Sequence, residues 1–172
     1  MLPHLVLRDE TAADAAVIAG VTIAAFRTLA ISNHTEQFII EALRNAKALI
    51  ISLVAELNGQ IVGHISFSPV TISGDTLNWY AIGPVSVLPE YQRQGIGSAL
   101  ITAGLERLRQ LNASGCCLVG HPEYYQKFGF KNTDALVLEG IPPEVFFVLS
   151  FGASMPHGVV CFHSAFLADG SK

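Results

Sequence analysis

The sequence predicts an α/β protein of the α+β kind, in which helices cover a mixed sheet. Three observations support this fold class. Short apolar runs of strand length alternate with amphipathic segments of helix length. Two β-rich runs are joined by Asn58-Gly59, a strong signal for a hairpin. The 172 residues, 51% of them hydrophobic, can bury a two-sided core and show no repeat or linker, so we expect one domain over residues 1–172.

The first half of the chain predicts one strand, two helices and the hairpin. Residues 4–10 have the composition of a short strand that ends in acidic residues. From Thr11 to Phe26 apolar residues recur at helical spacing, and Thr11 is a suitable N-cap. A second amphipathic helix is predicted over 35–46, and the hairpin occupies 49–72.

The middle of the chain predicts a strand, a glycine-containing loop and a long helix. Residues 77–89 form the strand, with Gly83-Pro84 inside it as a bulge or kink. We expect the helix to begin at Ser98, where helical spacing of apolar residues starts, and to end at Ser114-Gly115.

The last third of the chain predicts short strands and one short helix. A buried strand is expected at 116–120 and a helix at 122–128 that opens on Pro122. Further strands are predicted at 135–138, 145–151 and 158–163. We expect the last two of these strands to pair with each other at one end of the sheet. The apolar tail favours an ordinary core strand over a pocket wall or the subunit interface of a homodimer.

Composition excludes several function classes. The net charge is −4 and no basic block occurs, which argues against nucleic-acid binding. No apolar run reaches the ~18 residues of a membrane-spanning helix, and the start lacks the layout of a signal peptide. Cys116 and Cys117 are adjacent and Cys161 is distant, so they form neither a metal site nor a disulfide framework. We therefore expect a cytoplasmic protein with reduced cysteines in its core and no metal.

The segment "VLPEYQRQGIGSAL", residues 87–100, suits the binding of a phosphate group. Gly95 and Gly97 remove side chains where the loop would meet a ligand, and the start of the following helix presents unpaired N–H groups to an anion. Arg93 adds positive charge. The alternative is an ordinary strand-to-helix turn. A Walker loop lacks its Gly-Lys-Ser/Thr here, and a dinucleotide fold lacks its third glycine and its acidic residue.

Two motifs in this order resemble the GNAT superfamily of acetyl-CoA-dependent N-acetyltransferases. "VSVLPEYQRQGIGSALI" is similar to its coenzyme A motif, a strand followed by Gln/Arg-x-x-Gly-x-Gly/Ala and a helix. "CLVGHPEYYQKFGF" is similar to its next motif, which ends in Tyr-x-x-x-Gly-Phe. The resemblance covers about Val6 to Phe130 and is strongest to a group of small bacterial predicted N-acetyltransferases. It implies a mostly antiparallel central sheet in which two parallel strands splay apart, with flanking helices.

The resemblance also implies where acetyl-CoA binds as co-substrate. The pantetheine would enter between the splayed strands and pair with backbone groups of the first one. The Val87 N–H would hold the oxyanion of the thioester carbonyl. The loop N–H groups would take the pyrophosphate. The implied coenzyme-binding residues are Val85, Ser86, Val87, Gln92, Arg93, Gln94, Gly95, Ile96, Gly97 and Ser98.

The resemblance assigns one catalytic side chain and leaves the general base open. Tyr125 aligns with the tyrosine that protonates the leaving thiolate, and its alternative role is that of a packed aromatic. Tyr124 is expected to be structural. Neither splayed strand carries a carboxylate, so a water chain is as good a base as any side chain. The candidate bases are His121, Glu123, His64 and Glu36.

The predicted function is transfer of an acetyl group to the primary amine of a small molecule or a peptide by direct attack on the thioester. The alternative is a non-catalytic module that binds or senses acyl-CoA. Release of thiol across an amine panel separates the two. The acceptor site is expected opposite the coenzyme, at Phe26, Asn33, Glu36, His64, Ser66, Phe67 and Ser68.

Overall fold

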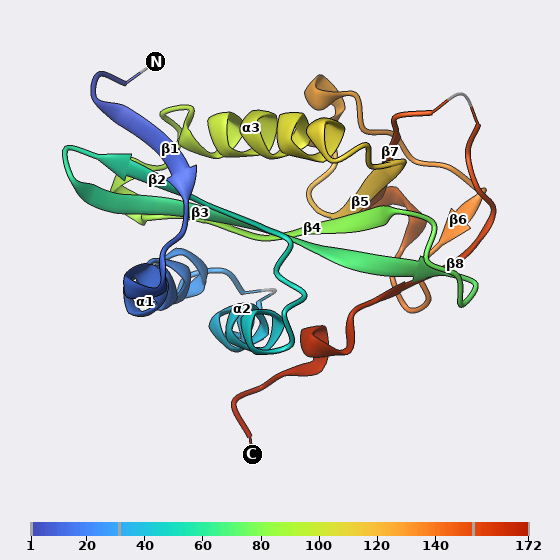
Figure 1. Ribbon diagram of the computed structural model, residues 1–172, viewed down its shortest axis with the longest axis horizontal. Coiled ribbons are helices and arrows are strands. Elements are labelled where there is room, and N and C mark those ends of the chain that lie inside the picture. Colours follow the sequence, from blue (N-terminus) through green and yellow to red (C-terminus); the bar gives the residue numbers. More distant parts are fainter. Residues whose placement is uncertain (1, 31, 153, 172) are drawn as a thin grey trace.

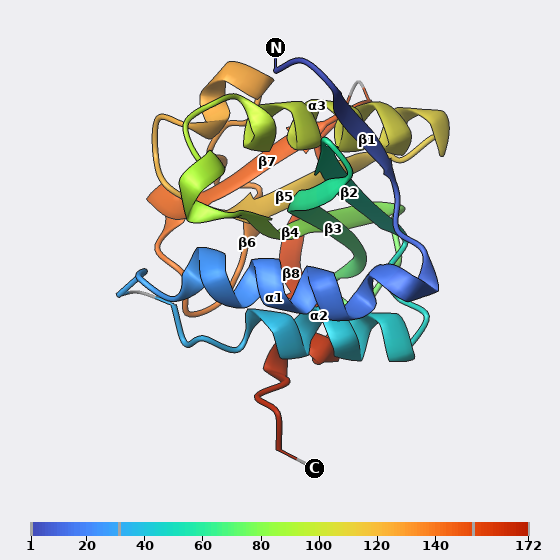
Figure 2. The same ribbon diagram turned by 90° about the vertical axis from the view of Figure 1, so that its left-hand side faces the viewer.

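An eight-stranded sheet separates two helical layers in the computed structural model, which describes residues 2–30, 32–152 and 154–171 (Figures 1 and 2). Two helices cover one face and the third covers the other. The helices are α1 (Ala15–Phe26), α2 (Glu36–Asn45) and α3 (Ile96–Gln110). The strands are β1 (Leu5–Asp9), β2 (Ile51–Leu57), β3 (Gln60–Ile72), β4 (Trp79–Val87), β5 (Gly115–Val119), β6 (Leu136–Val137), β7 (Phe146–Ser150) and β8 (Gly158–Phe162). Short 3₁₀ turns are η1 (Ala12–Asp14), η2 (Pro89–Tyr91), η3 (Tyr125–Phe128), η4 (Pro143–Val145) and η5 (Ser164–Leu167).

The sheet is mostly antiparallel, as predicted. Its main path runs β1-β2-β3-β4-β5-β7, and β8 pairs with β3 and with β6. Only β4–β5 and β6–β8 are parallel among the described strands. The β2–β3 hairpin turns at Asn58 and Gly59, whose φ angles of 51° and 81° are those of the predicted two-residue turn.

A bulge in β4 confirms the irregularity predicted at Gly83-Pro84. Ile65 of β3 faces Val85, and Phe67 faces Ile82. Two residues of β4, Gly83 and Pro84, therefore lie opposite the single residue Ser66, whose hydroxyl donates to the Pro84 carbonyl at 3.0 Å. One extra residue on one strand defines a β-bulge.

The parallel strands β4 and β5 pair over only three positions, from Trp79–Gly115 to Ala81–Cys117. Beyond Ala81, β4 continues to Val87 with β3 as its partner, while β5 continues to Val119 with β7 as its partner. The two strands thus separate toward their carboxyl ends and leave one side of β4 without a neighbouring strand.

The core lies on both sides of the sheet, and β3 and α3 approach each other closely at one point. Phe67, fully buried, fits against Gly104 of α3, where a Cβ atom would stand 2.2 Å from the ring. Cys116 and Cys117 are buried in β5, as expected, whereas Cys161 is exposed. Of the helices in the described part of the chain, none has the length and apolar character needed to cross a membrane.

Four predicted helix boundaries were wrong. The helix expected from Thr11 starts as the 3₁₀ turn η1, and α1 begins only at Ala15. Helix α3 begins at Ile96 and not at Ser98, because Gly95, at a φ of 89°, is its N-cap. It ends at Gln110 and not at Ser114-Gly115, and Gly115 instead opens β5. The helix predicted from Pro122 is only the turn η3.

The predicted pairing of the two tail strands was also wrong. β7 lies along β5, with Phe147 opposite Leu118. β8 lies along the far end of β3, which at thirteen residues extends past β4, with Val160 opposite Ile72. Each tail strand thus occupies its own free edge. Ala153, the end of the apolar tail run, lies outside the described residues.

Candidate active site

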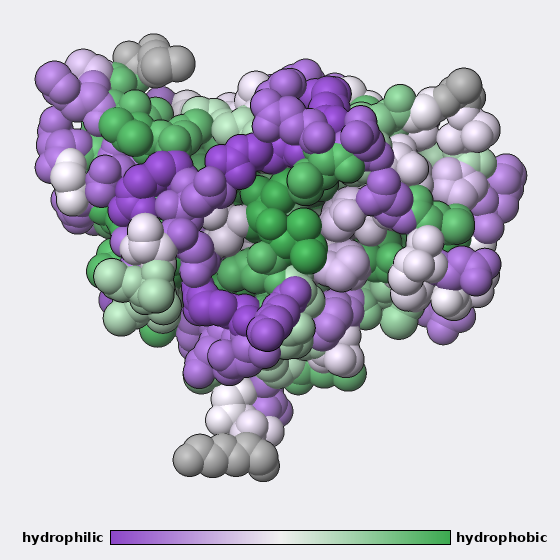
Figure 3. All heavy atoms as spheres, viewed as in Figure 1, coloured by the Kyte–Doolittle hydropathy of each residue, from purple (hydrophilic) through white to green (hydrophobic). Residues whose placement is uncertain are grey.

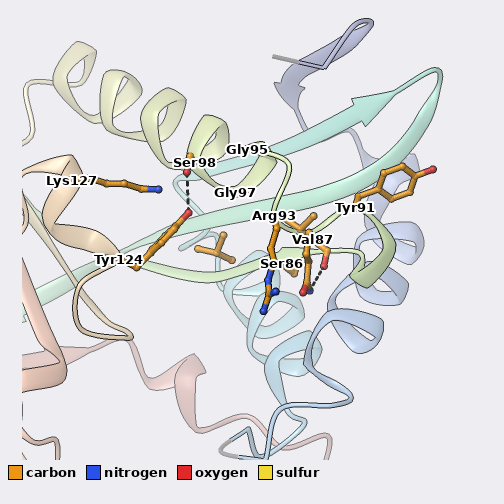
Figure 4. A pocket seen from close by; sticks show the side chains of 11 residues that line it. Ser86, Val87, Tyr91, Arg93, Gly95, Gly97, Ser98, Tyr124 and Lys127 are labelled. Carbon is orange, nitrogen blue, oxygen red and sulfur yellow. Dashed lines mark hydrogen bonds between the residues drawn. The ribbon is translucent and has the colours of Figure 1, made fainter.

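A cleft of about 450 Å³ opens beside the unpaired end of β4 (Figure 4). It lies between β4, the loop into α3 and the segment that follows β5; we call it the β4–α3 cleft. Its lining residues are Val85, Ser86, Val87, Tyr91, Gln92, Arg93, Gly95, Gly97, Ser98, Tyr124 and Lys127. Eight of the ten predicted coenzyme-binding residues are in this set.

The backbone of β4 faces the cleft at alternate residues. The Leu88 N–H donates to the Val62 carbonyl at 2.8 Å, which marks a hydrogen-bonded pair of the antiparallel ladder. Such pairs alternate, so Ser86 exchanges its backbone bonds with His64 of β3. The N–H and C=O groups of Val85 and Val87 therefore point away from β3. The Val87 carbonyl accepts from the Gln92 side-chain amide at 2.9 Å on that side.

Ser86 therefore differs from its neighbours. Its backbone N–H and C=O groups are hydrogen-bonded to β3, and its hydroxyl lies 3.5 Å from the Thr22 hydroxyl of α1. Of the three strand residues predicted to pair with pantetheine, Val85 and Val87 have outward backbone groups and Ser86 does not.

The loop before α3 presents the start of the helix to the cleft. Arg93 and Gly95 have φ angles of 62° and 89°, and these two left-handed residues turn the chain into the helix. The first helical bond runs from the Ala99 N–H to the Gly95 carbonyl at 3.0 Å. The N–H groups of residues 96–98 precede that bond and have no helical acceptor, which makes this end attractive to an anion.

Gln94 and Ile96 are the two predicted residues that do not line the cleft. The Gln94 amide donates to the Glu90 carbonyl at 3.3 Å, and the Ile96 side chain is buried in the core against the sheet. Their side chains thus stabilise the loop and the helix start.

Tyr124, which was expected to be structural, lines the cleft. Its hydroxyl shares a hydrogen bond with the Ser98 hydroxyl, with 3.1 Å between the oxygens (Figure 4). Tyr124 directly precedes η3, which begins at Tyr125, and of the two tyrosines Tyr124 is the one that lines the cleft.

Tyr125 is not among the described residues that line the cleft; it packs against Tyr124 and other aromatic side chains. Its ring centre is 6.2 Å from that of Phe130 and 6.0 Å from that of Phe147. Gly120 makes room for it, since a Cβ atom there would stand 2.2 Å from the ring. Burial raises the pKa of the Tyr125 hydroxyl to about 12, so it keeps its proton at neutral pH. Its role as general acid stays a prediction.

The candidate bases lie away from the β4–α3 cleft. His121 and Glu123 are exposed, and the His121 ring contacts the Pro122 carbonyl beside it. Glu36 accepts hydrogen bonds at 2.8 Å from the Ser32 hydroxyl, between α1 and α2. None of these residues lines the cleft.

His64 belongs to a buried polar cluster under α2. Its Nε2 atom lies 2.7 Å from the Ser52 hydroxyl, which in turn donates to Glu10. Arg44 of α2 holds the same carboxylate through two bonds, at 2.8 and 3.0 Å. Burial lowers the pKa of His64 to about 4, so the ring is neutral at neutral pH.

The predicted acceptor residues divide into two groups. His64, Ser66, Phe67 and Ser68 are fully buried within β3 and offer no surface to a substrate. Phe26, Asn33 and Glu36 lie at the end of α1, in the connection and at the start of α2, where they are partly or fully exposed. The structure thus leaves only the second group accessible.

A mixed sheet whose parallel strands separate beside a glycine-rich helix start is the architecture of the GNAT proteins. Residues 22–130 match the Acetyltransferase (GNAT) family, which is more than half of the chain. The protein therefore belongs to the GNAT acetyltransferase family.

Two sequence relatives come from Escherichia coli K12. The chain is 32% identical to the uncharacterized N-acetyltransferase YhbS over 100 residues, which are 58% of this chain and 60% of YhbS. It is 39% identical to the uncharacterized N-acetyltransferase YjhQ over 83 residues, 47% of this chain and 46% of YjhQ. The chain thus spans less than two thirds of either relative.

Two solved structures share the fold along nearly the whole chain. A GNAT family acetyltransferase from Brucella melitensis in complex with acetyl-CoA is 50% identical, with a TM-score of 0.86 over 95% of this chain and 98% of its own. YhbS from E. coli in complex with CoA is 26% identical, with a TM-score of 0.88 over 99% and 96%.

Proposed function

We propose that the protein transfers the acetyl group of acetyl-CoA to the primary amine of a small molecule or a peptide. The amine nitrogen attacks the thioester carbonyl, a C–N bond forms, and the C–S bond breaks as the tetrahedral oxyanion collapses. The amine gives up a proton to water or to a base, the departing thiolate takes one from the Tyr125 hydroxyl, and the Tyr125 phenolate regains a proton from water.

The outward backbone of Val85 and Val87 carries this proposal. The separation of β4 and β5 leaves these N–H and C=O groups without a strand partner. An extended pantetheine, which bears two amides, can satisfy them as a substitute strand. These N–H groups have no acceptor in a neighbouring strand, and this supports the proposal that the Val87 N–H donates to the thioester oxyanion.

The start of α3 is proposed to bind the pyrophosphate of the coenzyme. Gly97 and Ser98 at the start of α3 and Arg93 line the same cleft, and their N–H groups and positive charge suit a pyrophosphate. The relatives solved with acetyl-CoA and CoA support the same ligand here.

The acceptor is proposed to approach from the α1–α2 connection, past Phe26, Asn33 and Glu36. No carboxylate lies on β4 or β5, so we propose that water carries the amine proton to solvent. The exposure of these three residues admits acceptors of more than one size.

The experiment is a screen of primary amines and amino-terminal peptides with acetyl-CoA, with thiol release as the readout. Thiol release that requires both acetyl-CoA and an amine, with a product heavier by one acetyl group, is the expected result. Binding of acetyl-CoA by calorimetry without thiol release across the panel would instead favour a non-catalytic acyl-CoA sensor, the alternative that the missing strand carboxylate supports.

A further inference from the structure

Lys127 brings a second positive charge to the β4–α3 cleft. Of the described residues that line the cleft, Arg93 and Lys127 are the two charged ones. Figure 4 shows Arg93 on the loop side and Lys127 on the η3 side, with Tyr124 between them. The two cations therefore serve different parts of a ligand.

The Lys127 ammonium is held in place by aromatic rings. Its nitrogen lies 4.3 Å from the centre of the Tyr124 ring and 5.3 Å from that of Phe128. Both distances fall within the range of a cation–π interaction. Tyr124 is itself fixed by its hydrogen bond to Ser98. An exposed lysine without such contacts would sample many rotamers. The contacts with Tyr124 and Phe128 therefore keep the Lys127 charge oriented toward the cleft.

Coenzyme A carries more negative charge than the loop can neutralise. The pyrophosphate uses the N–H groups at the start of α3 and the Arg93 guanidinium. The ribose 3′-phosphate is a separate monoester with a charge of roughly −1.5 to −2 at pH 7. The protein's own net charge of −4 makes an unpaired phosphate unfavourable near its surface.

We infer that Lys127 binds the ribose 3′-phosphate of the coenzyme and that Tyr124 is its positioning residue. This inference rests on the proposed use of acetyl-CoA. An ammonium is a compact point charge with three donors, which suits a monoester dianion that offers three oxygens. The consequence is that the protein distinguishes CoA from 3′-dephospho-CoA, and that Lys127 is the source of the difference.

The test is calorimetric titration of the intact protein and two variants with CoA and 3′-dephospho-CoA. Lys127→Met keeps an unbranched side chain that can pack on Tyr124 but removes the charge; Arg93→Met is the matched control. We expect the parent protein to bind CoA about tenfold more tightly than 3′-dephospho-CoA, as befits one charge-assisted contact. Lys127→Met should remove this preference by weakening CoA alone, whereas Arg93→Met should weaken both ligands by the same factor.

Three results for the Lys127→Met variant would overturn the inference, as would two results for the parent protein. Equal weakening of both ligands by Lys127→Met would place Lys127 on the pyrophosphate. Unchanged affinities would make it a surface residue without contact to the ligand. A preference that persists in Lys127→Met would assign the 3′-phosphate to another group. A parent protein that binds neither ligand would refute the proposed function along with the inference, whereas a parent that binds both equally refutes the inference alone.

Discussion

Gly97 offers the sharpest test of the β4–α3 cleft, because the protein itself tolerates a side chain there. A Cβ atom at this position would stand 3.5 Å from the Tyr124 hydroxyl and 3.9 Å from the Cγ2 atom of Val87, both ordinary van der Waals distances. Gly97→Asp should therefore fold and place its carboxylate between these two residues, inside the cleft. Gly97→Asn is the matched control, with the same shape and no charge.

The magnitude follows from Coulomb's law. A phosphate held by the first-turn N–H groups would lie about 4 Å from the new carboxylate, where two unit charges repel by ~4 kcal/mol at an effective dielectric of about 20 and by ~1 kcal/mol in bulk water. The cleft is open on one side, so we expect ~2–3 kcal/mol, or roughly 30- to 150-fold weaker binding of CoA by Gly97→Asp than by Gly97→Asn.

Calorimetry with CoA at low and high salt measures this difference, and thermal unfolding confirms that both variants are folded. The Asp-to-Asn ratio should shrink as salt rises, because screening acts on the charge term and not on the shape term. Equal affinities for the two variants would place the pyrophosphate elsewhere and refute our interpretation of the loop.

Three further perturbations test the site and the fold. Tyr125→Phe should lower turnover with saturating acetyl-CoA by ~10²-fold and change CoA affinity only a few-fold; turnover equal to that of the parent would leave Tyr125 a packing residue. Gly104→Ala should lower the free energy of unfolding by ~1–3 kcal/mol through overlap with the buried Phe67 ring, whereas a gain would show that the ring can move. His64 has a pKa near 4 in the folded protein and 6.5 in the unfolded chain, so the unfolded chain binds the proton more readily. The contribution of the neutral His64 ring to the free energy of unfolding is therefore complete above about pH 6.5 and is lost as the pH falls toward 4. Urea titrations should show that the free energy of unfolding is ~2 kcal/mol lower at pH 5 than above pH 6.5, and that this difference largely disappears in His64→Gln. An equal difference in that variant would assign the pH dependence to other groups.

Local signals in the sequence predict where strands and turns occur better than they predict which strands pair with each other. The turn at Asn58-Gly59 is predictable because both residue types tolerate the positive φ that a two-residue hairpin needs. The edges that β7 and β8 occupy are not predictable in this way. Both are short apolar strands, and nothing within a strand's own pattern distinguishes the free side of β5 from the protruding end of β3.

The candidate site likewise contains residues that the sequence predicts and residues that it does not. The glycines and Arg93 follow from the chemistry of a phosphate loop, and the structure brings them together. Tyr124, directly before η3, and Lys127, within it, both line the cleft. In the sequence, Lys127 has no feature that separates it from any other exposed lysine. Its place depends on how the segment after β5 closes over the start of α3.

The bulge at Gly83-Pro84 explains how β4 serves both the core and the cleft. Before it, Ile82 pairs with Phe67 on the α3 side of the sheet. In a regular strand the alternation would put Ser86 on that apolar side and aim Val85 and Val87 at the polar side of Thr22 and His64. The extra residue reverses the alternation. Ser86 then meets the Thr22 hydroxyl, the two valines pack toward α3, and their backbone groups face the side that β5 has left open. A change of one residue in register thus determines which peptide groups are available to a ligand.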